Sequence, residues 1–209
     1  MNPNIKAVLF DFGGVISSSP FEAFAHYEES NGLPTGFIRG LNATNPDRNA
    51  WAHLERGDVS FEEFCTLFED EAIAAGHTLK AAAVMELLSG EIRPAIVRAI
   101  TVCHQSLKTA LLTNNFITTA PGDGVALNQF DGLFDVIVQS STAGVRKPDP
   151  RFYELACTEL GIQADEAVFL DDLGINLKPA RAMGMTTIKV NDPVRAIAEL
   201  ADLVGLDLT

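Results

Sequence analysis

Residues 5–14 read IKAVLFDFGG, a run of apolar side chains that ends on Asp11 and is followed by Gly13 and Gly14. A short, continuous apolar run bounded by glycines is typical of a β-strand that is buried on both faces. In an open sheet of parallel strands, ligands bind beyond the carboxyl ends of the strands. This stretch therefore predicts a buried strand that carries an acidic side chain to the edge of a sheet.

Similar apolar runs recur along the second half of the chain, separated by stretches with helical periodicity. The further strands are predicted at 108–113, 134–140, 167–171 and 186–190. The helices between and after them are predicted at 93–106, 150–161, 175–183 and 192–204. Strands that alternate with helices of this length favour a parallel sheet covered on both faces, so we expect an α/β fold with a Rossmann-like core.

Residues 17–90 interrupt this alternation. They read as successive amphipathic helices with glycine stops and contain no convincing strand. An all-helical insert directly after the first strand predicts a small cap of four or five helices. We therefore expect a core formed by 1–16 and 91–209 and a helical cap formed by 17–90.

Composition limits the classes of partner. The formal net charge is −13, from 28 acidic and 15 basic residues, which argues against nucleic acid or an anionic membrane as the main partner. A small phosphorylated ligand remains compatible with this charge if a metal ion and one lysine supply local positive charge. Three widely spaced cysteines without a CxxC pair argue against a zinc or disulfide scaffold. With no signal peptide and no apolar run of membrane-spanning length, we expect a cytoplasmic protein, monomeric or homodimeric.

Polar residues follow three of the predicted strands. They are Asp11 after the first strand, Thr113-Asn114-Asn115 after the second, and Asp171-Asp172 at the end of the fourth, and Lys147 precedes a predicted helix. Such residues suit phosphoryl chemistry. A carboxylate can act as a nucleophile, a hydroxyl, an amide and an ammonium can donate to phosphoryl oxygens, and clustered carboxylates need a hard cation such as Mg²⁺.

Each of these residues also has an ordinary structural interpretation. Taken alone, Asp11 could cap a helix or a turn, Thr113 with Asn114 could form a turn, and Lys147 could be a solvated loop charge. The adjacent acids Asp171 and Asp172 repel each other unless a counter-ion is present. The order of the whole set along the chain, and its placement at strand ends, favour a functional site.

Four segments resemble the motifs of the haloacid dehalogenase (HAD) superfamily: FDFGGV, LLTNN, VRKPDPRFYELA and FLDDLGINLKPARAMGM. The subgroup implied is the one with a helical cap inserted between the first two motifs. The last segment is similar to the N-terminal phosphatase domains of soluble epoxide hydrolases. The opening FDFGGVISSSPF resembles the HAD-like domain of acyl-CoA dehydrogenase relatives. The cap matches only in its helical character and its LERGDVSFEEF turn, so no substrate is implied.

The resemblance implies a role for each motif residue. Asp11 would be the nucleophile, Thr113 and Asn114 would hold the phosphoryl group, and Lys147 would bridge it to Asp11. Asp172 would bind Mg²⁺ directly, with Asp171 as a second ligand or as the residue that orients a metal-bound water. Asp11 and the backbone carbonyl of Gly13 would complete the metal site. Gly14 and Asn115 are expected to contact the substrate, and Asn176 to be structural.

Gly13 departs from the family pattern, because phosphatases of this superfamily usually carry a second aspartate there, as the general acid and base. Three interpretations follow. The substrate has a leaving group that needs little protonation, such as an acyl phosphate or an anomeric sugar phosphate. Alternatively, another residue supplies the proton, with Glu22, His26, His53 and Glu55 as candidates. Or the domain binds a ligand or partner without turnover.

The cap offers candidate substrate contacts in Arg48, Trp51, His53 and Arg56, and the alternative is that Trp51 packs in the cap while the charges are solvated. The dehalogenating branch of the superfamily carries an aromatic residue where this chain has Gly13, and it lacks a metal. Dehalogenation is therefore the weaker alternative. The sequence predicts a Mg²⁺-dependent phosphatase that acts on a small phosphorylated metabolite, with a non-catalytic binding domain as the main alternative.

Overall fold

The computed structural model of the chain describes residues 4–88, 90–114, 130 and 132–208. Its centre is a five-stranded sheet in the order β3-β2-β1-β4-β5, and every neighbouring pair is parallel. The strands are β1 (Ala7–Phe10), β2 (Lys108–Thr113), β3 (Val136–Gln139), β4 (Ala167–Asp171) and β5 (Thr186–Lys189). All five predicted strands are confirmed, and so is the Rossmann-like α/β class.

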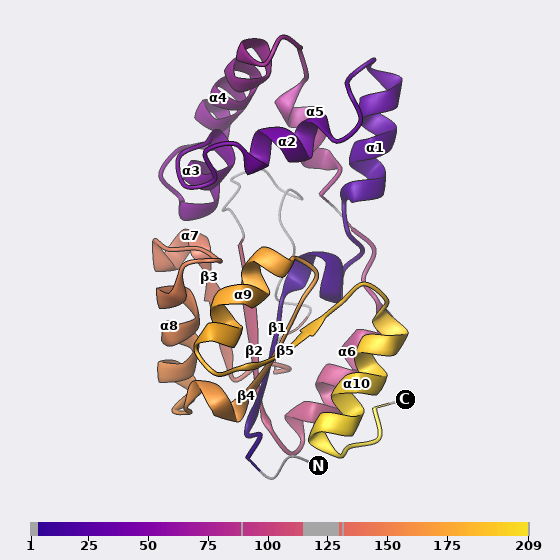
Figure 1. Cartoon of the computed structure of the whole chain (residues 1–209), viewed down its shortest axis with the longest axis vertical. Coiled ribbons are helices and arrows are strands. Elements are labelled where there is room, and N and C mark those ends of the chain that lie inside the picture. Colours follow the sequence, from indigo (N-terminus) through magenta and orange to yellow (C-terminus); the bar gives the residue numbers. More distant parts are fainter. Residues whose placement is uncertain (1–3, 89, 115–129, 131, 209) are drawn as a thin grey trace.

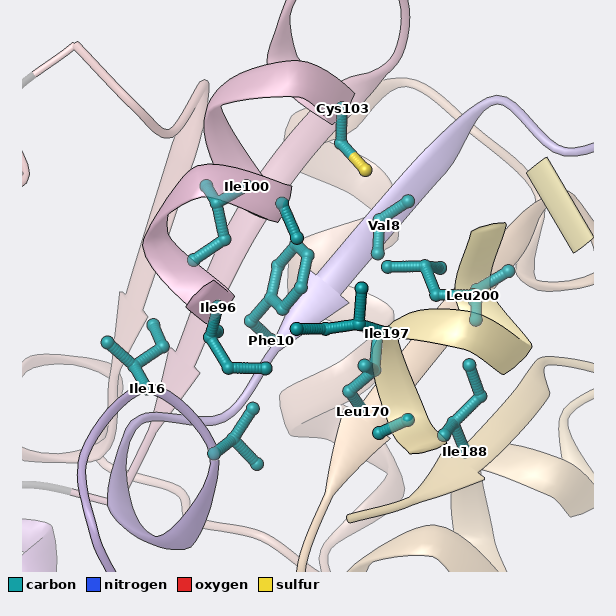
Figure 2. Close-up of a cluster of buried hydrophobic side chains, with 14 of the residues drawn as sticks. Val8, Phe10, Ile16, Ile96, Ile100, Cys103, Leu170, Ile188, Ile197 and Leu200 are labelled. Carbon is teal, nitrogen blue, oxygen red and sulfur yellow. The ribbon is translucent and has the colours of Figure 1, made fainter. Parts of the chain in front are cut away.

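The central strand β1 explains why the apolar run has no polar alternation. Val8 and Phe10 point into one hydrophobic cluster, and Ala7 and Leu9 point into another on the opposite face. Helices α6 (Pro94–His104) and α10 (Pro193–Val204) cover the first face, where they enclose Phe10 (Figure 2). Helices α8 (Pro150–Leu160) and α9 (Gly174–Ala182) cover the second (Figure 1). Burial on both faces requires apolar residues at every position.

Helices α1–α5 lie together at one end of the molecule, beyond the carboxyl ends of the strands (Figure 1). They are α1 (Phe21–Ser30), α2 (Phe37–Ala43), α3 (Ala50–Arg56), α4 (Phe61–Ala74) and α5 (Ala81–Glu86). Their apolar faces form a third hydrophobic cluster, separate from the two around the sheet. We refer to α1–α5 and their connections as the cap. The core also contains short elements: the turn Phe12–Ile16, α7 (Ser140–Ala143) and the 3₁₀ turn Ala164–Glu166.

Helix α2 carries no capping signal at its first residue, and its start shows what replaces one. Its N-cap is Gly36, which has no side chain to accept from the first backbone N–H groups. The carboxylate of Glu28, on α1, supplies these acceptors instead. It accepts from Gly36 N at 2.6 Å and from Ile38 N at 2.9 Å. The helix therefore starts at a cap that comes from another helix.

The two connections between cap and core run side by side. Ser17 and Ile92 form an antiparallel bridge, Ser18 N donates to the carbonyl of Glu91 at 2.8 Å, and Arg93 N donates to the carbonyl of Ile16 at 2.8 Å. The insert thus leaves and re-enters the core at one place. None of the described helices is long and apolar enough to cross a membrane.

The turn after β1 (Phe12–Ile16) contains two glycines in different circumstances. Gly14 has φ 77°, and a Cβ there would overlap the carboxylate of Asp172 and lie 3.0 Å from its Cβ. Gly13 has φ −70° and ψ 127°, an ordinary conformation, and no atom lies within 4 Å of the place where its Cβ would be. Only Gly14 is required by the backbone and by the approach of Asp172.

We therefore expect Gly14→Ala to lower the free energy of unfolding by roughly 2–4 kcal/mol, from the left-handed backbone and the overlap with Asp172. For a chain of this size that corresponds to a fall in Tm of about 5–15 °C. Gly13→Ala is the matched control and should change stability by less than about 1 kcal/mol in either direction. Thermal unfolding followed by circular dichroism measures both, and equal losses in the two variants would contradict this account of the turn.

Candidate active site

Three carboxylates meet where β1 and β4 end. Asp11 directly follows β1, Asp171 is the last residue of β4, and Asp172 comes next. Because β1 and β4 are adjacent and parallel, their carboxyl ends lie at the same edge of the sheet. One oxygen from each carboxylate lies within 4.8 Å of the others. The acids that the sequence placed at separate strand ends form a single cluster.

Lys147 is the positive charge inside this cluster. Its ammonium group lies 2.6 Å from Asp11 Oδ1 and 2.9 Å from Asp171 Oδ2, and it donates to the carbonyl of Leu112 at 2.9 Å. The side chain is 1% exposed. Burial alone would lower the pKa of Lys147, but the two carboxylates raise it above its usual value. Lys147 therefore stays protonated and its three N–H groups are all used.

Asp171 is held from several sides. Its carboxylate accepts from Lys147, from the backbone N–H of Leu173 at 2.8 Å and from the amide of Asn176 at 3.1 Å to each oxygen. The hydroxyl of Tyr153 donates to the carbonyl of Asn176 at 2.7 Å. Asp171 is fully buried. These contacts fix its orientation, and the structural role of Asn176 stays a prediction with which its bonds to Asp171 agree.

Asp172 and Asp11 carry negative charge that the ammonium group of Lys147 balances only in part. Burial, with a smaller contribution from Asp171, raises the pKa of Asp172 to about 6. Burial also raises the pKa of Asp11, and Asp171 and Asp172 add to this, while Lys147 opposes it. Three carboxylates thus share one ammonium group, with Asp172 the most open of the three. A cluster of carboxylate oxygens with excess negative charge fits a hard divalent cation, which would be held by Asp11 and Asp172.

Asn114 holds the backbone of Lys147. Its Nδ2 donates to the carbonyl of Lys147 at 3.0 Å, and its Oδ1 accepts from Lys147 N at 2.9 Å. This pairing positions the lysine, and the expected contact of Asn114 with a phosphoryl group stays a prediction. Thr113 ends β2, next to β1, and is buried. Asn115 lies outside the described residues.

The cap residues proposed as substrate contacts have partners within the cap. The indole of Trp51 packs edge-on against Phe64 and Phe68, with ring centres 5.5 Å apart in each case, and its Nε1 donates to Glu55. Arg56 donates to Asp58 at 2.9 Å and to the carbonyl of Asp47 at 3.0 Å. Arg48 is exposed. Their roles as substrate contacts stay predictions.

Of the candidate proton donors, Glu55 is the one that is buried and faces the core. Burial raises the pKa of Glu55, while Arg146, Trp51, Lys147 and Asn114 oppose the rise. His53 pairs with Asp58 at 3.0 Å, and His26 is exposed. The side chain of Glu22 lies outside the described part of the chain.

Arg93 is a site residue that the sequence analysis missed. Its Nη1 donates to the carbonyl of Gly14 at 2.6 Å and approaches that of Val15 at 3.3 Å. Its charge also lowers the pKa of Asp172, against the larger effect of burial. Arg93 therefore ties the re-entry of the chain into the core to the glycine turn. An arginine before the first proline of a helix carries no local signal for such a contact.

The model of the haloacid dehalogenase-like hydrolase family matches residues 5–184. The chain is 35% identical over 209 residues to acyl-CoA dehydrogenase family member 10 of Mus musculus, covering 97% of this chain and 19% of that protein. It is 29% identical over 219 residues to bifunctional epoxide hydrolase 2 of Sus scrofa, covering 98% and 40%. The chain thus spans a fifth to two fifths of these two relatives. Sesquiterpene phosphatase astK of Aspergillus oryzae matches at 27% identity, over 98% of this chain and all of that protein.

Solved structures share the fold. A predicted HAD-like hydrolase from Porphyromonas gingivalis superimposes with a TM-score of 0.69 at 21% identity, over 97% of this chain and 99% of that one. A HAD family enzyme from Bacteroides thetaiotaomicron in complex with magnesium and inorganic phosphate has a TM-score of 0.59 at 17% identity, over 88% and 93%. A dehalogenase has a TM-score of 0.65 at 17% identity, over 99% and 100%. The chain belongs to the haloacid dehalogenase-like hydrolases.

Proposed function

We propose that this hydrolase is a Mg²⁺-dependent phosphatase that removes phosphate from a small phosphorylated metabolite through a phospho-Asp11 intermediate. The observation that carries the proposal is the cluster of Asp11, Asp171 and Asp172 around the ammonium group of Lys147. The phosphatase among the relatives and the magnesium and phosphate in a structural neighbour support it.

The residues of the chain divide the work of the reaction. An oxygen of Asp11 attacks phosphorus, the bond to the leaving oxygen breaks, and water then hydrolyses the acyl phosphate and frees the carboxylate. Lys147 neutralises charge on the attacking carboxylate and on the transferred group. The Thr113 hydroxyl donates to a phosphoryl oxygen. When bound, Mg²⁺ would supply positive charge next to the phosphoryl oxygens, held by Asp11, Asp172 and the carbonyl of Gly13, with Asp171 in support.

Gly13 narrows the range of substrates. It has no side chain to protonate the leaving oxygen, and a positioned general acid or base is worth about 10²–10⁴ in rate. We therefore propose leaving groups that depart without protonation, as from an acyl phosphate or an anomeric sugar phosphate. The same absence of a side chain favours, as the second candidate, a domain that binds a phosphorylated ligand without turnover.

The nucleophile and the metal each have a direct test. Asp11→Asn should lower kcat on p-nitrophenyl phosphate by more than about 10³-fold, because an amide cannot form the acyl phosphate. Removal of divalent cations with EDTA should abolish turnover, and added Mg²⁺ should restore it. The exposed Asp202→Asn serves as the matched control. Hydrolysis that persists in Asp11→Asn or in EDTA would show that the mechanism is different.

Binding of Mg²⁺ should strengthen as the pH rises from 5 to 8. The pKa of Asp172 is about 6 and that of Asp11 is raised, so protons occupy the carboxylates at the lower pH and must leave before the cation binds. Isothermal titration with MgCl₂, in buffers of different ionisation enthalpy, measures both the affinity and the protons released. An affinity that does not change over this range would indicate carboxylates with ordinary pKa values near 4.

The leaving-group proposal predicts a difference between substrates. Acetyl phosphate or a sugar 1-phosphate should be cleaved about 10²–10⁴ times faster than an alkyl phosphate. Gly13→Asp should narrow this gap, since the site has room for the side chain and an ordinary backbone angle. Gly13→Asn has the same shape without the acid and should leave the gap unchanged. Equal rates on both substrate types in the unaltered protein would refute the proposal.

The binding-domain alternative makes the opposite prediction. It expects no turnover on any phosphate in a panel with Mg²⁺, and binding of the phosphorylated ligand that survives Asp11→Asn.

A further inference from the structure

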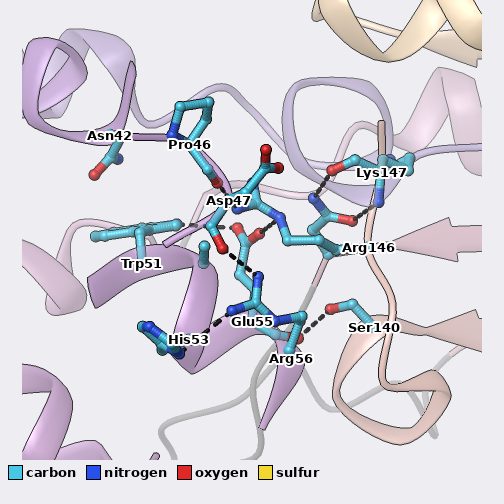
Figure 3. A network of polar contacts seen from close by, with 12 residues as sticks. Asn42, Pro46, Asp47, Trp51, His53, Glu55, Arg56, Ser140, Arg146 and Lys147 are labelled. Carbon is cyan, nitrogen blue, oxygen red and sulfur yellow. Dashed lines mark hydrogen bonds and ion pairs between the residues drawn. The ribbon is translucent and has the colours of Figure 1, made fainter. Parts of the chain in front are cut away.

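A partly buried ion pair joins the cap to the core next to the site. Arg146 Nε, on the segment between α7 and α8, lies 2.7 Å from Glu55 Oε2 on α3 (Figure 3). The two side chains are 21% and 9% exposed. Neither residue belongs to the cluster of acids around Lys147, and no step of the proposed hydrolysis uses them.

Further contacts gather at the same two residues. Nη1 of Arg146 donates to the carbonyl of Pro46 at 3.0 Å, just before α3. The hydroxyl of Ser140 donates to the backbone carbonyl of Glu55 at 2.5 Å, and Trp51 Nε1 donates to Glu55 Oε1 at 3.0 Å. The cap and the core are therefore joined here through a charge pair and through two backbone carbonyls of the cap, those of Pro46 and Glu55.

The end of α3 fits closely on α7. Gly57, which ends α3 at φ 73°, has so little room that a Cβ would lie 3.1 Å from the carbonyl oxygen of Ser141. The ion pair is thus embedded in a packed contact between the two helices and is not an isolated surface pair.

The core side of this contact leads directly to the site. Arg146 precedes Lys147, whose backbone N–H and carbonyl are both bonded to the side chain of Asn114. Both Lys147 and Asn114 also lower the pKa of Glu55, by less than Arg146 and Trp51 do and against the larger rise caused by burial. Movement of α3 relative to the core would therefore act on the backbone of Lys147 and on Asn114, which holds that backbone.

The energetics of burial make the pair cooperative. Burial raises the pKa of Glu55, and Arg146 is the largest opposing influence. A buried charge that loses its partner is strongly destabilising, whereas loss of both partners is tolerated far better. When the cap separates from the core, both side chains must regain water together. Loss of the Arg146 charge alone should therefore cost more than loss of both charges together.

We propose that Glu55 and Arg146 form a clasp that holds α3 on the core and positions Lys147 for the reaction. This inference rests on the proposed phosphatase function. Through the clasp, the position of the cap on the core and the position of Lys147 change together. Glu55 and Arg146 are positioning residues, because they act through Asn114 and Lys147.

Kinetics of single and double variants test the clasp. Arg146→Met keeps much of the side-chain length and removes the charge, so kcat/KM should fall about 10- to 100-fold. Most of the loss should appear in KM, since a smaller fraction of molecules occupies the competent state. The double variant Glu55→Gln/Arg146→Met should recover part of the loss, because no unpaired charge stays buried. Arg146→Lys should lie between Arg146→Met and the unaltered protein.

Arg151→Met is the matched control, since Arg151 is exposed and pairs with Asp149 at the start of α8, five residues after Arg146. A loss in Arg146→Met no larger than in Arg151→Met, or losses that simply add in the double variant, would overturn the proposal.

A second readout does not depend on turnover. Trp51 is the only tryptophan of the chain, and its indole N–H bonds the clasp carboxylate. Its fluorescence should shift to longer wavelength in Arg146→Met and stay unchanged in Arg151→Met. Amide hydrogen exchange should quicken in residues 46–56 and 140–147. If no phosphate is hydrolysed, the proposed function fails while these signals still test the clasp. An active enzyme whose Trp51 fluorescence and exchange do not respond to Arg146→Met would exclude it.

Discussion

One buried ammonium group organises the site. Lys147 lies between Asp11 and Asp171 and also donates to the end of β2, so three neighbouring strands are joined at their carboxyl ends by a single side chain. A buried charge is tolerated only when it is paired and hydrogen-bonded. The ends of these strands carry the groups that pair with the Lys147 ammonium group. The same charge balances only part of the surrounding acidity. The carboxylates left over are the ones that we propose bind Mg²⁺.

Local patterns were sufficient to predict the core. The central strands are short apolar runs. Helices α8 and α10 each begin with a capping aspartate followed by proline and end at glycine. What could not be predicted from local patterns depends on contacts between distant segments. Helix α2 begins at the carboxylate of Glu28, and Arg93 bonds the carbonyl of Gly14 from nearly eighty residues away. No spacing rule in a single sequence identifies such partners.

The candidate site divides in the same way. Asp11, Lys147 and the Asp171-Asp172 pair could be placed together from the sequence, because parallel strands bring their ends to one edge. The partners of cap residues could not. Trp51 was considered both as a substrate contact and as a packing residue, and it lies between aromatic rings of the cap with its N–H on Glu55. Helical spacing shows which side chains share a face but leaves open what that face contacts.

The two glycines after β1 differ in what the fold requires of them. At residue 14 the backbone angle and the approach of Asp172 leave room for hydrogen alone, so this position is bound to the architecture. At residue 13 the backbone is ordinary and the space beyond it is open. A lineage can therefore gain or discard a side chain at residue 13 by a single substitution without rebuilding the turn. Substitution at residue 13 can therefore change the chemistry of the site while the fold is kept, whereas substitution at the neighbouring residue 14 would disturb the fold.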